Sequence, residues 1–171
     1  MNHRQDIYAG TVHMTFLKGA SAGPYLMSAN PKMTQLARGG ISSWPWADPG
    51  KISIMGSAAF GIDGNDVDLI VARSGVDVAK AKKAGMSFEL KTTPAGGQWA
   101  RVKPDRGVVN ISVLPDETFD RVRQSYQQAV DNKAKLFKKL RAEGKVSKEE
   151  IYRRCGVLVT VDYTAKFDRP L

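Results

Sequence analysis

An apolar, β-branched run over Val67–Ala72 is the strongest constraint on the fold, and it begins on the pair Asp66-Val67-Asp68. A run of this length and composition is typical of a strand buried inside a sheet. The alternating segment 51–55, which stops at Gly56, predicts the preceding strand. The chain is therefore expected to build a sheet with its polar residues gathered where strands begin or end.

Further strands are expected beyond this pair, because apolar runs alternate with turn sequences rich in Pro, Gly and Asp. The expected strands are 86–92, 98–102, 108–114 and 157–163, with a weaker one at 6–17. Short helices are expected at 31–38, 57–60 and 76–84, a long amphipathic helix from Pro115 to near Gly144, and a last helix opened by the capping box of Ser147 and Glu150. This order predicts an α/β (α+β) fold with a mixed β-sheet packed by late helices, in a single domain over 1–171.

The composition limits which metals and which cellular locations are expected for this chain. The chain has 171 residues, of which 42% are hydrophobic, and this suits one domain with a substantial core. One cysteine and two histidines argue against a zinc site, so any metal is expected to be held by oxygen, as magnesium or manganese are. We expect no membrane contact, because no apolar run approaches the length of a span. The single cysteine and the absence of an apolar leader favour a cytoplasmic location.

The net charge of +9 predicts attraction to polyanions such as nucleic acid or nucleotide phosphates. Its alternative explanation is solubility alone. Residues 115–156 hold eleven basic and seven acidic side chains, and the basic ones are expected to form a solvated helix face rather than a phosphate-binding stripe.

The segment 55–71 carries the clearest chemical pattern. Asp66 and Asp68 stand two apart at the start of a strand, so they would face the same way, and two adjacent carboxylates repel unless a cation lies between them. Gly56 and Ser57 precede a short helix, where backbone N–H groups are placed to hold a phosphate. A turn explains Asp66 equally well but not Asp68, which adjoins the apolar run.

Gly56-Ser57, the spacer with Phe60-Gly61, and Asp66-Val67-Asp68 together resemble the signature of the polymerase-beta-type nucleotidyltransferase superfamily. The tract from Asn110 to Phe119 and the long helix after it also resemble nucleotidyltransferases of tailed bacteriophages, and the resemblance covers about 51–140, a nucleotidyltransferase-like core. It implies that Gly56 and Ser57 grip nucleotide phosphates and that Asp66 and Asp68 ligate magnesium.

The third family carboxylate would fall at Asn110, within 108–113, and this is the main departure from the pattern. An amide can ligate a metal but cannot act as a base. Three explanations stay open: nucleotide binding without efficient turnover, substitution by Asp105 or Asp116, or a fold kept for binding. Asn110 as an ordinary hydrogen-bonded strand residue is an equally weighted explanation.

The resemblance implies magnesium-dependent transfer of a nucleoside monophosphate from an NTP to a hydroxyl acceptor, such as RNA or a protein. The alternative is a catalytically degenerate phage protein that binds a host protein or nucleic acid in the host cytoplasm. Arg101 and Lys103 are candidate phosphate contacts. Trp44 and Trp46 are candidates for a core plug and, if exposed, a stacking surface.

Overall fold

The computed structural model describes residues 44–62, 66–104 and 109–171, and the backbone of two short strands, β1 (Met14–Thr15) and β2 (Leu26–Met27). These two strands pair with each other in antiparallel orientation. Strand β1 falls within the strand expected at 6–17, of which the rest lies outside the described residues, as does the helix expected at 31–38.

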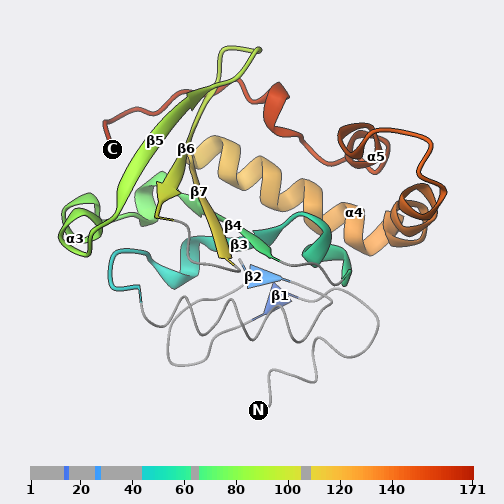
Figure 1. Cartoon of the computed structure of the whole chain (residues 1–171), viewed down its shortest axis with the longest axis horizontal. Coiled ribbons are helices and arrows are strands. Elements are labelled where there is room, and N and C mark those ends of the chain that lie inside the picture. The colour runs from blue at the N-terminus through green and yellow to red at the C-terminus, as the bar shows by residue number, and fades with distance from the viewer. Residues whose placement is uncertain (1–13, 16–25, 28–43, 63–65, 105–108) are drawn as a thin grey trace.

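A mixed sheet of five strands forms the centre of the fold (Figure 1). Its strands, in spatial order, are β3 (Ile52–Met55), β4 (Val67–Ala72), β7 (Val109–Leu114), β6 (Gln98–Lys103) and β5 (Ser87–Thr92). The pair β4–β7 is parallel, and the other three pairs are antiparallel. The sheet and its helices confirm the expected α/β (α+β) class.

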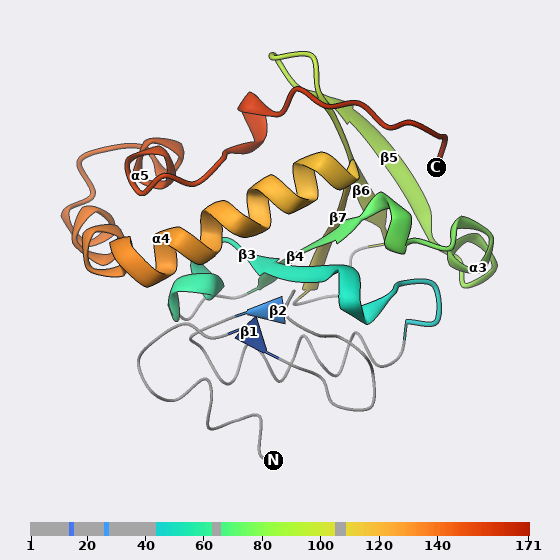
Figure 2. The ribbon, with the colours of Figure 1, turned by 180° about the vertical axis from the view of Figure 1, so that it is seen from behind.

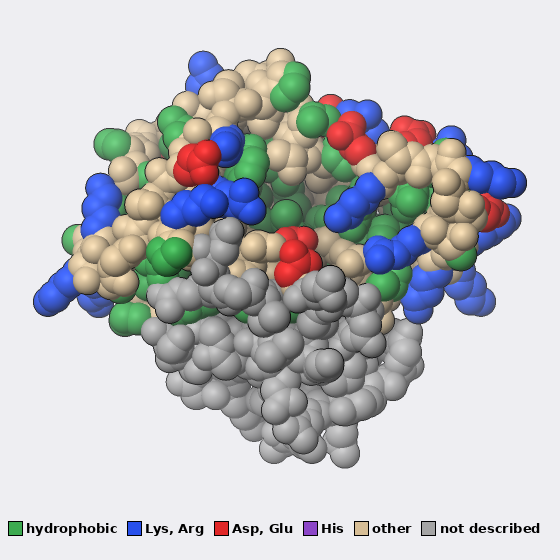
Figure 3. Space-filling model, in the orientation of Figure 1, with side chains coloured by type: hydrophobic (Ala, Val, Ile, Leu, Met, Phe, Trp, Pro, Cys, Tyr) green, Lys and Arg blue, Asp and Glu red, His purple; other side chains and the backbone are tan. Residues whose placement is uncertain are grey.

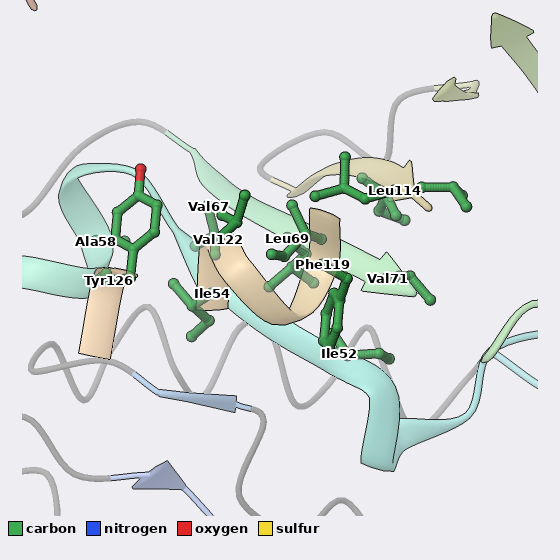
Figure 4. Close-up of a cluster of buried hydrophobic side chains, with 14 of the residues drawn as sticks. Ile52, Ile54, Ala58, Val67, Leu69, Val71, Leu114, Phe119, Val122 and Tyr126 are labelled. Atoms are coloured by element: carbon green, nitrogen blue, oxygen red, sulfur yellow. The ribbon is translucent and has the colours of Figure 1, made fainter. Parts of the chain in front are cut away.

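The long helix α4 (Asp116–Glu143) packs along this sheet, and α5 (Lys148–Arg154) follows at its far end (Figure 2). Phe119, Val122 and Tyr126 of α4 gather with the alternate residues Ile54 and Leu69 of the strands, as Figure 4 shows. The three- and four-residue spacing on the helix therefore meets the two-residue spacing on the strands. The hydrophobic core lies between α4 and the strands of the sheet.

Local sequence explains where the helices begin. The side chain of Asp77 accepts a hydrogen bond from the backbone of Lys80 and caps α3 (Val78–Lys83). Ser147 accepts from the backbone N–H of Glu150 at 3.2 Å and caps α5, as the capping box predicted. The Glu150 side chain turns instead to Arg154. Short 3₁₀ turns connect the strands: η2 (Pro49–Lys51), η3 (Ser57–Phe60) and η4 (Arg73–Gly75).

The prediction of a strand at 157–163 is wrong. This segment runs extended and then forms a 3₁₀ turn, η5 (Thr160–Asp162). Val157, Val159 and Tyr163 are buried, so the alternation is real, but the backbone of Leu158 bonds to the Ser125 hydroxyl of α4 rather than to a strand. Alternating burial arises here from an extended chain lying on a helix.

Gly97, in the turn between β5 and β6, ties the C-terminal segment to the sheet. Its N–H donates to the carbonyl of Tyr163 at 3.0 Å, and Gln98 donates to the carbonyl of Ala165. A Cβ at Gly97 would lie 2.2 Å from the Tyr163 oxygen, so the backbones meet closely only because no side chain intervenes. The red C-terminal ribbon in Figure 1 accordingly returns from α5 to this turn.

Aromatic side chains join η3 to the two late helices. Phe60 stacks on Phe137 with ring centroids 3.9 Å apart. Tyr152 packs against both of these rings at tilted angles, and Tyr126 packs against Phe60. Trp44 and Trp46 are both buried and stacked on each other, so both serve as core residues and neither is an exposed stacking surface. None of the described helices is long and apolar enough to cross a membrane.

Candidate functional site

The parallel strands β4 and β7 begin at the same edge of the sheet, and this edge carries the polar cluster predicted from the sequence. Asp68 of β4 lies in register with Asn110 of β7, and Asp66 immediately precedes β4. The Asn110 amide donates to Asp66 Oδ2 at 2.8 Å and to Asp68 Oδ1 at 3.2 Å. One amide nitrogen thus bridges the two carboxylates, in a position where a cation would also satisfy both.

The two carboxylates occupy different environments. Asp66 is exposed, whereas Asp68 is half-buried beside the end of β3. Burial raises the pKa of Asp68 above its ordinary value; the Asn110 hydrogen bond opposes that rise and the charge of Asp66 adds to it. A bound cation would therefore stabilise the ionised form of Asp68.

Gly56 lies directly against Asp68. Its backbone has φ +74° and ψ −163°, a conformation essentially confined to glycine, and a Cβ there would lie 2.9 Å from Asp68 Oδ2. The Tyr126 hydroxyl is hydrogen-bonded to the Gly56 backbone. The Gly-Ser turn therefore packs on the carboxylate, as the sequence pattern suggested, and α4 holds it in place.

Positive charges surround the carboxylates. Lys148, the first residue of α5, and Arg101 of β6 both lower the pKa of Asp68 through their charge. Arg101 is in register with Ser112 of β7, two residues beyond Asn110, so it shares the sheet face of the amide. Lys103 lies two residues further along the same strand, on that face. Figure 3 shows a small acidic patch in the middle of the molecule with Lys and Arg side chains to both sides.

A cavity of about 340 Å³ opens beside Asp68. It lies between the end of β3, the late helices and the C-terminal segment, and its lining is mostly apolar, with polar groups from Asp68, Lys148 and Thr160. This size and mixed lining are typical of small-molecule sites. The lining residues are Met55, Gly56, Asp68, Tyr126, Lys148, Glu149, Tyr152, Leu158, Val159, Thr160, Val161 and Tyr163. Ser57, Arg101 and Lys103 are not among them.

Sequence reasoning missed the two tyrosines of this cavity. Tyr126 belongs to the long amphipathic helix expected after Pro115, and the motifs of the sequence do not include Tyr152. Both are buried, burial raises the pKa of both, and the Tyr152 hydroxyl has no hydrogen-bond partner in the described part of the chain. The available signal was the hydroxyl itself, because a tyrosine on a buried face needs a polar partner that leucine would not.

Asp116 does not replace the missing third carboxylate. It follows β7, at the end of the sheet opposite to Asp68 and Asn110, and accepts a hydrogen bond from the Ser74 backbone at 2.9 Å. Asp105, the other candidate, lies outside the described residues. Among the described residues, the side chain that joins Asp66 and Asp68 is the amide of Asn110.

The residues present fit a hard divalent cation. Asp66 and Asp68 supply carboxylate oxygens, and rotation of the Asn110 amide by half a turn would present its oxygen in place of its nitrogen. The Asp68 carboxylate is already partly desolvated. Within the ranges that the structure describes, no group of three or more Asp, Glu, His or Cys side chains is placed to hold a metal, so a cation here would use two carboxylates and the amide.

Two of the late basic residues are engaged elsewhere. Arg153 pairs with Asp162 at 2.9 Å and with Glu149, and Arg154 pairs with Glu150 at 3.0 Å. These pairs connect α5 to its own turns and to η5, as expected for a solvated helix face. Cys155 is buried, and burial raises the pKa of its thiol.

Comparison with known proteins adds no relative: no protein-family model, curated protein or solved structure matches this chain. The functional interpretation therefore depends on the geometry of the site and on the resemblance of its motifs.

Proposed function

We propose that this protein binds a nucleoside triphosphate with a divalent cation, magnesium or manganese, at Asp66 and Asp68, and transfers the nucleoside monophosphate to a hydroxyl acceptor. The observation that carries the proposal is the pair of carboxylates bridged by one Asn110 nitrogen, 2.8 and 3.2 Å away. Repulsion within such a pair is relieved by a bridging donor or by a cation. The motif resemblance supplies the reaction class.

The neighbouring groups suit a nucleotide. The apolar and aromatic cavity beside Asp68 offers space for the nucleoside, with Tyr126 and Tyr152 in its wall. Lys148 and Arg101 place positive charge around the carboxylates, where phosphates would lie. A bound magnesium ion would supply charge neutralisation for the phosphates.

In the proposed reaction, the acceptor oxygen forms a bond to the α-phosphorus while the bond to the bridging oxygen of the β-phosphate breaks, and pyrophosphate leaves. The chain would contribute binding and orientation through Asp66, Asp68 and the cationic side chains. The proton of the hydroxyl would pass to solvent, because the Asn110 amide cannot accept it. We therefore expect slower turnover than a three-carboxylate site would give.

The amide at this third position also favours a second candidate function. A site that keeps its carboxylate pair but lacks a base is suited to nucleotide binding without turnover, as in a degenerate nucleotidyltransferase-fold protein that modulates a host protein or nucleic acid. Such a protein would contact its host partner through surface Lys and Arg side chains, and loss of Asp66 or Asp68 would abolish its nucleotide binding but not that contact.

Calorimetric titration with ATP, GTP, CTP and UTP, each with and without magnesium, tests the proposal. We expect magnesium-dependent binding of at least one NTP. Asp68→Asn should abolish it, because the substitution keeps the side-chain size but removes the charge that holds the cation. Asp116→Asn is the matched control, since it makes the same change at the opposite end of the same two strands.

Transfer is then measured with the bound NTP labelled at the γ-phosphate, by following release of labelled pyrophosphate. Binding with pyrophosphate release supports the enzyme, whereas binding without it, over a panel of RNA and protein acceptors, favours the degenerate protein. Absence of NTP binding, or equal binding by wild type and Asp68→Asn, would overturn the proposal.

A further inference from the structure

Strand β5 forms one edge of the five-stranded sheet, far in the strand order from the carboxylate site. It pairs with β6 alone, and its outer row of backbone N–H and C=O groups has no strand beside it among the described elements. Four of its six residues are exposed. Leu90, at its centre, is 55% exposed and is the sole large hydrophobic residue so exposed in the described ranges.

This edge lacks the features that keep edge strands apart. Proteins protect such edges with proline, β-bulges or like charges that repel a second strand. β5, with the sequence Ser-Phe-Glu-Leu-Lys-Thr, has no proline, and its six residues pair with β6 without a bulge. Its two charges, Glu89 and Lys91, cancel and are joined as an ion pair. Among the described residues, no strand covers this edge, so it is open to pairing along the length of β5.

The order of side chains along β5 is complementary to itself. If two copies of the strand lie antiparallel about Leu90, Leu90 faces Leu90, and Glu89 of each copy faces Lys91 of the other. Opposite charges directly across an antiparallel pair stabilise it, and exposed leucine side chains gain by burial against each other. A parallel arrangement in register would instead set like charges side by side.

A hollow with a mixed lining flanks the same strand. Phe88 and Leu90 line a cavity of about 440 Å³ together with Gln98 and residues 167–171 of the C-terminal segment, which include the charged Asp168 and Arg169. Phe88 and Leu90 alternate with Glu89 and Lys91, so the apolar and charged side chains of β5 occupy opposite faces of the strand. Pairing of two copies would therefore bring Phe88 and Leu90 of both copies together on one face and the four charges of the two strands on the other.

We propose that the chain forms a symmetric dimer in which β5 pairs antiparallel with β5 of a second copy, about a two-fold axis at Leu90, so that one sheet runs through both molecules. This proposal does not depend on the proposed function. A contact of one strand pair and its flanks belongs to the class of small interfaces, so we expect a dissociation constant of about micromolar order. The net charge of +9 on each copy should make association stronger at higher salt.

Sedimentation velocity of the full chain, from about 1 µM to about 200 µM, brackets this range and tests the proposal. Wild type should shift from monomer to dimer. Glu89→Lys and Lys91→Glu should each weaken self-association by at least about tenfold, because each sets like charges across the axis. Lys82→Glu, on the exposed surface of α3, repeats the charge change away from β5 and should dimerise as wild type does.

The two variants together give the decisive measurement. A mixture of Glu89→Lys and Lys91→Glu restores opposite charges across the axis, so the mixture should form a heterodimer at concentrations where each variant alone is mainly monomeric. Circular dichroism of each variant checks that it is folded. A wild type that stays monomeric throughout, or folded variants that dimerise as strongly alone as mixed, would overturn the proposal.

Discussion

Replacing Gly56 with alanine tests how the turn after β3 is coupled to the carboxylate site. The backbone at Gly56 has φ +74° and ψ −163°, and holding another residue there costs about 1–3 kcal/mol. The new Cβ would lie 2.9 Å from Asp68 Oδ2, so the carboxylate must move away from it. Loss of the 3.2 Å bond from Asn110 to Asp68 would cost about 1 kcal/mol more.

We therefore expect Gly56→Ala to lower the free energy of unfolding by about 2–4 kcal/mol, measured by urea denaturation with linear extrapolation. Gly85→Ala is the control. Gly85 also has a positive φ of +83°, but a Cβ there meets nothing within 4 Å, so this variant should lose about 1–2 kcal/mol from backbone strain alone.

The excess loss in Gly56→Ala over Gly85→Ala combines the costlier backbone conformation of Gly56 with the contact with Asp68. If Gly56→Ala is within about 0.5 kcal/mol of wild type, the strain argument at this turn is refuted. If the two variants lose the same stability, the Asp68 contact has no energetic weight, and the close packing of turn and carboxylate would not be what positions the site.

Two further predictions concern the core that supports the site. Phe137→Ala should lower the free energy of unfolding by about 3–5 kcal/mol, because Phe137 is buried and stacked on Phe60 at 3.9 Å; urea denaturation checks this, and the exposed neighbour variant Lys138→Ala should change it by less than about 0.5 kcal/mol. Burial raises the pKa of Tyr163 to about 12, above its ordinary 10.0, so the unfolded chain loses this proton first as the pH rises. The stabilisation, about 3 kcal/mol, is complete below pH 10 and is lost toward pH 12. Wild type should therefore lose that much more stability than Tyr163→Phe between about pH 9 and about pH 12, and parallel pH profiles would contradict the argument.

Local pattern predicted most elements of this fold. The strand expected over Val67–Ala72 has those bounds in the structure, and the helix after Pro115 ends at Gly144 as its periodicity indicated. The 3₁₀ turn Ser57–Phe60 lies where a short helix was expected. Periodicity predicts these elements correctly because the buried face of an element consists of apolar residues that recur at fixed intervals. The interval is two residues in a strand and three or four in a helix.

At 157–163 the alternation of apolar residues predicts a strand that the structure does not contain. Val157, Val159 and Tyr163 are buried, but the backbone of this segment forms no ladder with a described strand. Alternation reports which side chains are buried and carries no information about what the backbone bonds to. Lys51 shows a smaller version of this limit, since it lies in the turn η2 rather than in the strand expected from residue 51.

The sequence by itself determined that Asp66 and Asp68 stand together where a buried strand begins, because their spacing and the apolar run are both local. Only the tertiary structure determines which other residues lie beside these two carboxylates. Asn110 reaches them across 42 and 44 positions because β7 lies parallel to β4 in register, and Lys148 and Tyr152 arrive from a helix beyond the sheet. Strand order and helix docking depend on how whole faces fit together, which no short stretch of residues encodes.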